Sequence, residues 1–235
     1  MNSLFSTKSF KAIAALVLAL TISLPVCAQT HYKPHLSIGV KGGMTMSKMS
    51  FSPSVKQSFS NGSAGAVTFR YTEEKLFGLI AELGWAQRGW KENFEDSPCQ
   101  YSRSLTYIKL PILTHIYFGS PRFKCFVNLG PEFDYMIADN ISSNFDYRNP
   151  FEADGFPTKA RMTEQMSMDI KNKFDYGITG GIGIEFYLTP RNSLTLEGRY
   201  YFGLGNIYPA AKADTFSASR NTSIEITLGY NFRLK

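Results

Sequence analysis

Residues 223–234 alternate strictly between apolar and polar side chains. The apolar positions are Ile224, Ile226, Leu228, Tyr230, Phe232 and Leu234. A period of two is typical of a β-strand with one apolar and one polar face. The same period recurs over residues 174–188 and 194–204 and, with more interruptions, over 36–46, 63–72, 77–90, 104–118 and 123–137. After residue 35, no segment long enough to form a substantial helix has its apolar residues spaced with the period of an α-helix. We therefore predict an all-β domain of eight antiparallel strands.

The connections between these strands alternate in length. Residues 72–76, 119–122 and 189–192 form short turns, whereas residues 47–62, 91–103, 139–173 and 205–219 form long loops. Outer-membrane barrels have short periplasmic turns and long external loops, and an even number of strands places both termini on the periplasmic side. The pattern therefore predicts an up-and-down transmembrane β-barrel in the cell outer membrane.

Aromatic residues on the apolar parity gather at both ends of the predicted strands. Near the short turns they are Phe77, Phe118, Phe123, Phe186 and Phe232, and near the long loops they are Trp85, Phe133, Tyr135, Phe174, Tyr176, Tyr200 and Phe202. Two such bands are typical of the interfacial girdles of a membrane barrel. The preference of aromatic residues for strands is an alternative explanation, but it does not account for clustering at both ends.

The polar parity carries seven residues of each charge. They are Lys41, Arg70, Arg88, Lys109, Lys124, Arg199 and Arg233, with Glu82, Glu132, Asp134, Asp175, Glu185, Glu197 and Glu225. The interior of an eight-stranded barrel is just wide enough to be filled by side chains. Because an unpaired buried charge is costly, the balance predicts an ion-paired lumen that is closed to solutes.

Residues 1–28 have the features of a signal peptide. Lys8 and Lys11 precede an apolar run over 12–24, and Val26-Cys27-Ala28 is a small-residue cleavage context, so we expect cleavage after Ala28. The run has 13 residues, fewer than the ~20 of a spanning helix. Lipidation of Cys27 is the less favoured alternative because Val26 stands where Gly, Ala or Ser is usual. Residues 29–235 then form the barrel domain.

Residues suited to catalysis or metal binding are scarce. Of the three histidines, His31 and His35 lie at or before the first strand, and we expect His115 to be hydrogen-bonded in the lumen. No catalytic, metal-binding or cofactor-binding residue is predicted, and the protein is expected not to be an enzyme.

The acidic residues of loop 139–173 alternate with basic ones, which favours a solvated, mobile loop over a calcium site. The basic residues are dispersed, so nucleic acid is not an expected partner.

Two cysteines remain in the mature domain. Cys99 falls in a long loop, where we expect it to be accessible outside the cell, and Cys125 follows a short turn and faces lipid. Strands rise ~3.3 Å per residue, and a disulfide needs Cα atoms within about 7 Å. We therefore expect these cysteines to remain unpaired with each other.

The chain resembles the PorT-like outer-membrane β-barrel ("porin") family common in Bacteroidota, over roughly residues 36–235. The matching segments are Gly39-Val40-Lys41-Gly42-Gly43 with Ser47, Glu82-Leu83-Gly84-Trp85 with Gln87 and Gly89, Tyr107-Ile108-Lys109-Leu110-Pro111-Ile112-Leu113, and Gly130-Pro131. That family often has Glu where this chain has Lys109. The resemblance implies the fold and the outer-membrane location, and one branch of the family is tied to protein secretion.

The favoured hypothesis is a monomeric, non-enzymatic barrel with a structural or surface-interaction role. Its expected partners are outer-membrane lipid and, as a further option, envelope or secretion proteins. A transport or protein-secretion accessory barrel is the alternative. A soluble lipocalin-like carrier would also have eight strands, but its apolar parity would point inward.

Overall fold

The computed structural model describes residues 34–73, 76–95, 97–157, 162–210 and 214–234. These residues belong to one compact unit, Lys33–Lys235. The predicted signal peptide, residues 1–28, falls outside the described residues. Within the described ranges, no helix has both the length and the apolar character to span a bilayer.

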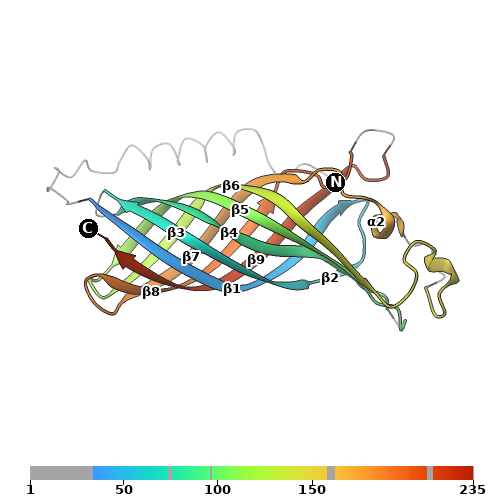
Figure 1. The fold of residues 1–235 in the computed structure, drawn as a ribbon, viewed down its shortest axis with the longest axis horizontal. Helices are drawn as coiled ribbons and strands as arrows, with labels where there is room; N and C mark the ends of the chain where they lie inside the picture. Colours follow the sequence, from blue (N-terminus) through green and yellow to red (C-terminus); the bar gives the residue numbers. More distant parts are fainter. Residues whose placement is uncertain (1–33, 74–75, 96, 158–161, 211–213, 235) are drawn as a thin grey trace, which may run out of the picture. The chain divides into compact units, whose positions relative to one another are not determined.

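The unit is an antiparallel sheet in which the eight long strands close into a ring (Figure 1). A ninth strand, the two-residue β2, pairs only with β4. The strands are β1 (His35–Ser52), β2 (Gln57–Ser58), β3 (Ser60–Thr72), β4 (Phe77–Glu92), β5 (Tyr101–Gly119), β6 (Phe123–Ser143), β7 (Phe174–Tyr187), β8 (Asn192–Gly203) and β9 (Ala218–Arg233). The predicted fold class and all eight predicted strands are confirmed. Two short helices, η1 (Pro150–Glu152) and α2 (Glu164–Ser167), lie between β6 and β7.

Each long strand pairs with two other long strands. The ring runs β1, β3, β4, β5, β6, β7, β8, β9 and back to β1. The first and last strands pair from Ser37–Arg233 to Ser52–Ala218, which completes the ring. Closure satisfies the backbone groups of every strand without water, as a bilayer requires.

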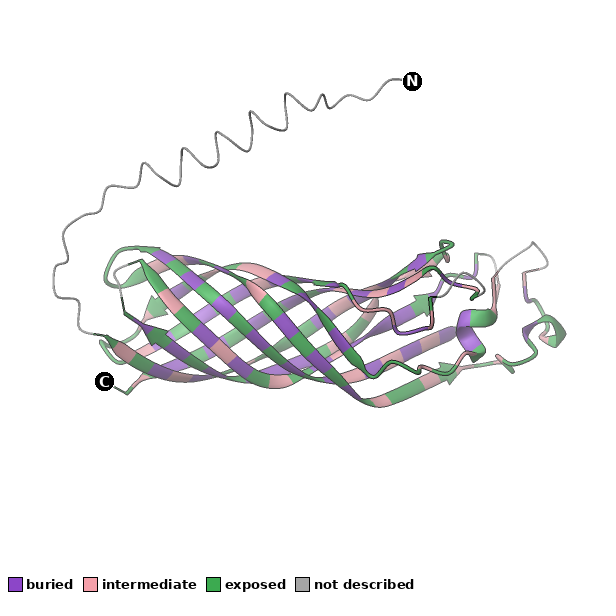
Figure 2. Ribbon diagram, turned by 90° about the horizontal axis from the view of Figure 1, so that it is seen from above, coloured by how far each residue is buried: buried purple, intermediate pink, exposed green. Residues whose placement is uncertain are grey.

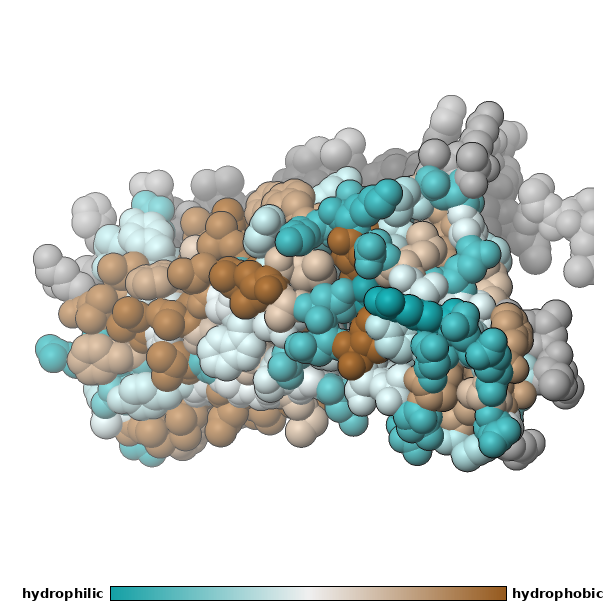
Figure 3. Space-filling view, turned by 45° about the vertical axis from the view of Figure 1, so that its right-hand side comes forward, coloured by the Kyte–Doolittle hydropathy of each residue, from teal (hydrophilic) through white to brown (hydrophobic). Residues whose placement is uncertain are grey.

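Burial alternates along every strand, as the banding of Figure 2 shows. In β9, the outward Leu228 is 61% exposed, whereas the inward Thr227 is 4% exposed. Polar residues therefore line the inside and apolar residues cover the outside, which is the reverse of a soluble lipocalin-like carrier. On the face shown in Figure 3, hydrophobic side chains predominate over the half that holds the short turns, and hydrophilic side chains predominate over the half that holds the loops. All residues of the two predicted aromatic bands are exposed.

The three predicted short turns are confirmed, since β3, β5 and β7 are each followed closely by the next strand. The turn after β5 begins at Gly119, whose φ of +135° is readily adopted only by glycine.

The strands extend further toward the long loops than the sequence indicated. Residues 47–62 were expected to be a loop, but β1 continues to Ser52 and β3 begins at Ser60. The inward side of this extension is apolar at Met49 and Phe51, whereas its outward residues Lys48 and Ser50 are polar. Beyond the apolar part of the exterior, outward side chains face water and can be polar. The alternation of apolar and polar residues therefore weakens here, although the strands remain hydrogen-bonded to each other.

At the loop end, the strands on one side of the ring extend further than those on the other, and we call the side with the shorter strands the low side. β7 begins at Phe174, opposite Tyr135 of β6, whereas β6 continues to Ser143 beside β5. On the low side, residues of the last loop cover the edge of β9, where Ile207 N donates to Ser219 O at 3.0 Å.

Candidate functional site

The centre of the lumen is filled by ion pairs that cross the barrel. Arg199 donates to both carboxylate oxygens of Glu82, at 2.8 and 3.0 Å, and to Glu197 at 2.9 Å. Lys41 lies 2.8 Å from Glu82 and 3.3 Å from Glu197. Lys109 pairs with Glu225. Three cations therefore balance three carboxylates in this layer, as the sequence predicted.

A second layer lies above the first, toward the loops. Arg88 pairs with Glu132 and, at 2.6 Å, with Asp134. Asp175 accepts a hydrogen bond from Asn221 at 2.8 Å. The guanidinium of Arg88 also lies 3.8 Å from the centre of the Tyr201 ring. One cation therefore faces three carboxyl groups of this layer.

A third layer lies at the short-turn end of the lumen. Arg70 donates to both oxygens of Glu185, at 2.8 and 2.9 Å. Lys124 and Arg233 also lie at this end, so the layer has three cations and one carboxylate. His115 is buried and its Nδ1 lies 2.7 Å from Asn128 Oδ1, which confirms the predicted hydrogen-bonded histidine of the lumen.

Charge in the lumen is therefore balanced in total but separated along the barrel axis. The sequence predicted only the balance. Acidic groups are in excess toward the loops, basic groups are in excess toward the short turns, and the middle is neutral.

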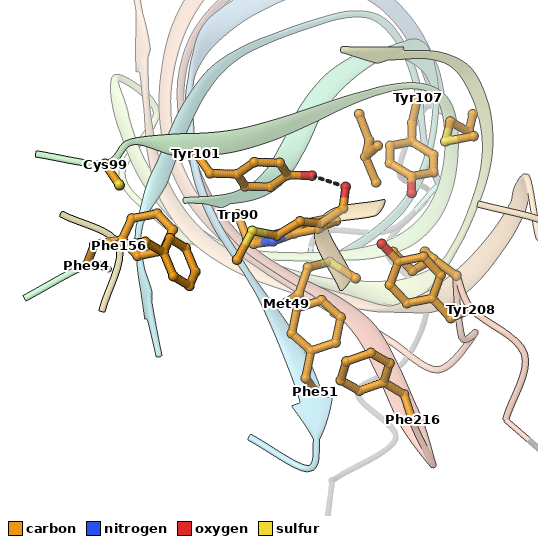
Figure 4. Close-up of a cluster of buried hydrophobic side chains, with 14 residues drawn as sticks. Met49, Phe51, Trp90, Phe94, Cys99, Tyr101, Tyr107, Phe156, Tyr208 and Phe216 are labelled. Atoms are coloured by element: carbon orange, nitrogen blue, oxygen red, sulfur yellow. Dashed lines mark hydrogen bonds between the residues drawn. The ribbon is translucent and has the colours of Figure 1, made fainter. Parts of the chain in front are cut away.

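Above the acidic layer, the inward side chains become apolar and form what we call the external plug (Figure 4). The residues come from the strand ends and from three loops. They are Met49, Phe51, Trp90, Phe94, Cys99, Tyr101, Leu105, Tyr107, Met136, Phe156, Met166, Ile207, Tyr208 and Phe216. Phe51 contacts Trp90 edge to face at 5.4 Å and Phe216 at 5.1 Å between ring centres. The plug closes the loop end of the lumen with packed hydrophobic side chains.

Hydrogen bonds from strand β5 and from the last loop hold helix α2 and the residue after it in the plug. Tyr101 Oη donates to Met166 O at 2.8 Å, and Tyr208 Oη donates to Gln165 O at 2.8 Å. Arg103 Nη1 donates to Met168 O at 2.7 Å, while its other nitrogens pair with Asp139. The Tyr208 hydroxyl is a hydrogen-bond donor at neutral pH, and burial raises its pKa further above the ordinary value.

These contacts correct two predictions. Loop 139–173 was expected to be solvated and mobile; its acidic residues Asp146, Glu152 and Asp154 are indeed exposed, but Met166 and Gln165 are fully buried within the barrel mouth. Cys99 was expected to be accessible, yet it is only 6% exposed because Phe94 and Phe156 belong to the same buried cluster. Cys99 and Cys125 are both free thiols. The loop is rich in charged residues, so its few apolar residues that become buried do not stand out in the sequence. The period of two identifies strands and gives no information about where loop residues pack.

Two open pockets lie at the loop end. One, of about 420 Å³, lies between Pro98 and the acidic residues Asp146, Glu152 and Asp154. The other, of about 680 Å³, lies on the low side of the ring, and Lys171, Lys173 and Tyr176 are among its lining residues. In the part of the chain that the structure describes, no cluster of three or more His, Cys, Asp or Glu residues is suited to holding a metal ion.

Comparison with known proteins supports the barrel assignment at the family level. A family model described as "Outer membrane protein beta-barrel domain" matches residues 27–208. No curated protein matches the chain.

Several solved structures are similar in fold. OprG from Pseudomonas aeruginosa is 12% identical with a TM-score of 0.49, over 84% of this chain and 95% of that one. Neisserial surface protein A is 13% identical with a TM-score of 0.42, over 83% and 96%. Ail of Yersinia pestis, in complex with the heparin analogue sucrose octasulfate, is 11% identical with a TM-score of 0.40, over 84% and 99%. Similarity at this level carries no information about activity.

Proposed function

This chain belongs to the outer membrane protein beta-barrel domain family and lies in the outer membrane of the cell, and on that basis we propose that it is a closed, non-enzymatic barrel with a structural or surface-interaction role. The observation that carries the proposal is the filling of the lumen. Three charged layers occupy its lower part, and the external plug occupies its upper part. A barrel filled in this way has no continuous water path for a solute.

The closed lumen can be tested in planar bilayers. We expect the purified, refolded protein to insert without discrete current steps. Detergent-solubilised protein gives the matched check on folding, because a folded barrel migrates differently from its heated form in a denaturing gel. Steady conductance of hundreds of picosiemens from folded protein would contradict the closed lumen and favour a channel.

The part of the protein available to partners is the external crown, which we define as residues 93–95, 97–100, 144–157, 162–173, 204–210 and 214–217. Its outer side chains include Phe151, which is 71% exposed, and the acidic residues beside the 420 Å³ pocket. A large exposed aromatic next to a polar pocket is typical of an interaction surface.

The structural and surface roles can be separated genetically. A strain that lacks the protein would be complemented with the full chain or with a variant whose residues 148–152 are replaced by a Gly-Ser linker, which leaves the plug residue Phe156 in place. Outer-membrane integrity would be measured as detergent resistance. Rescue by both indicates a structural barrel, and rescue by the full chain alone indicates a role of the crown. A defect that neither restores would contradict both roles.

Two finer assignments complete the proposal. Residues 1–28 are proposed to be a cleaved signal peptide, which N-terminal sequencing of the mature protein would test. A PorT-like relationship is supported by the segment Tyr107–Leu113, which lies in β5.

A further inference from the structure

The lumen opens at its short-turn end through what we call the vestibule. Its charged lining consists of Arg70, Lys124, Arg191, Arg233 and Glu185, and the rings of Tyr117 and Tyr187 lie beside them. The family places short turns on the periplasmic side, so the vestibule faces the periplasm.

Four cations of the vestibule face a single carboxylate. Glu185 already accepts four hydrogen bonds: Arg70 donates to both of its oxygens, Ser193 Oγ donates to it at 2.6 Å, and Tyr187 Oη donates to it at 3.2 Å. Among the residues that the structure describes, the three positive charges of Lys124, Arg191 and Arg233 have no carboxylate in an ion pair with them.

The geometry brings these charges together. Lys124 Nζ lies 5.0 Å from the centre of the Tyr187 ring, and Arg233 Cζ lies 5.8 Å from the same centre. Arg233 N donates to Arg191 O at 2.8 Å, so these two residues are backbone neighbours at the rim, and both line the vestibule. Neighbouring like charges repel, and an anion between them would convert that repulsion into attraction.

The inner wall of the vestibule also has an unused donor. Arg70 is 9% exposed, and its Nε is buried without an acceptor. Buried N–H groups are normally satisfied, but Arg88 Nε in the acidic layer is also buried without an acceptor, so this donor adds to the positive character of the inner wall and does not by itself identify a ligand.

We propose that the vestibule binds a phosphate-class oxyanion from the periplasm. An excess of three positive charges favours an anion with more than one negative charge over a simple carboxylate, and two arginines match phosphate oxygens with paired donors. The enclosed part of the vestibule holds only about one water-sized group. The anion therefore sits at the mouth with one oxygen directed inward.

Two sources share this chemistry. One is free phosphate in the periplasm, and the other is the phosphate headgroup of a phospholipid in the periplasmic leaflet.

The first arm of the test titrates inorganic phosphate into the folded full-length mature protein in a nonionic, phosphate-free detergent, followed by calorimetry. The test variant is Lys124→Gln/Arg233→Gln, which should weaken binding about tenfold or more. The matched control is Lys91→Gln/Lys171→Gln, which removes two exposed cations at the loop end and should leave binding unchanged. Acetate should bind more weakly than phosphate to the native protein.

The second arm uses nanodiscs of phosphatidylglycerol and native mass spectrometry of the lipid retained after detergent exchange. Phosphate binding in the first arm identifies the free ion as a ligand. Lipid retention that is lost in the test variant, without binding of free phosphate, identifies the headgroup. Heat-modifiable migration establishes that each variant is folded. Absence of both signals in the native protein, or equal signals in the test variant, would overturn the proposal.

Discussion

Arg199 on β8 and Glu82 on β4 face each other across the lumen and form a two-point ion pair, with donor–acceptor distances of 2.8 and 3.0 Å. The two strands lie on opposite sides of the ring. The pair therefore connects opposite walls of the barrel. Its strength should be measurable as stability of the whole domain.

Glu82→Gln is expected to lower the free energy of unfolding by about 3–5 kcal/mol, because it leaves Arg199 and Lys41 buried with fewer counter-charges. Urea unfolding in lipid vesicles measures the change. Glu95→Gln is the control, since the Lys56–Glu95 pair is exposed and should contribute about 1 kcal/mol or less. Similar losses for both variants would argue against an ion-paired lumen.

Leu228→Arg tests the outward parity of β9. The side chain is exposed in the middle of the strand, so arginine would face lipid and should cost roughly 2–4 kcal/mol of unfolding free energy. Ser142→Arg, at an exposed site near the loop end, is expected to be close to neutral. Folding yield in vesicles and urea titration give the comparison. Equal tolerance at the two sites would be incompatible with the assigned orientation.

Met166→Asp should detach helix α2 from the external plug, because a carboxylate at this fully buried position has no partner and is costly to desolvate. We expect faster trypsin cleavage after Lys171 or Lys173 in intact cells. Ser167→Asp changes the exposed neighbour on α2 and should leave the cleavage rate as it is in the native protein. No difference between the two variants would mean that α2 does not anchor the loop.

Cys99 should react slowly with a membrane-impermeant maleimide on intact cells, because the plug covers it. Met166→Asp should accelerate the labelling. Ser142→Cys, in a background without native cysteines, should be labelled at once. Immediate labelling of Cys99 in the native protein would contradict the buried position.

Peptide mapping under non-reducing conditions should find no Cys99–Cys125 disulfide. Cys125 pairs with Phe118 beside a short turn, whereas Cys99 lies in the plug at the other end. Recovery of the cross-linked peptide from folded protein would require a different strand register.

The strands, the short turns and the lumen residues were predictable because an apolar exterior imposes a strict period of two on every membrane-spanning strand. The external plug was not predictable for the same reason. Once Lys48 and Ser50 face water, the period weakens, and inward residues such as Phe51 no longer stand out. Separation of charge along the axis could have been found by comparing the distance of each charged residue from the nearest short turn. The polar parity carries equal numbers of positive and negative residues, so its total charge gives no sign of this separation.

Pairing of β1 with β9 joins residues from the two ends of the domain, as between Ser37 and Arg233. Contacts of such long sequence separation form slowly. An incomplete ring would present unpaired backbone groups to lipid, where each is costly. Insertion is therefore all-or-none: the chain must stay unfolded and protected in the periplasm until its final strand arrives, and a truncated product has no stable place in the bilayer.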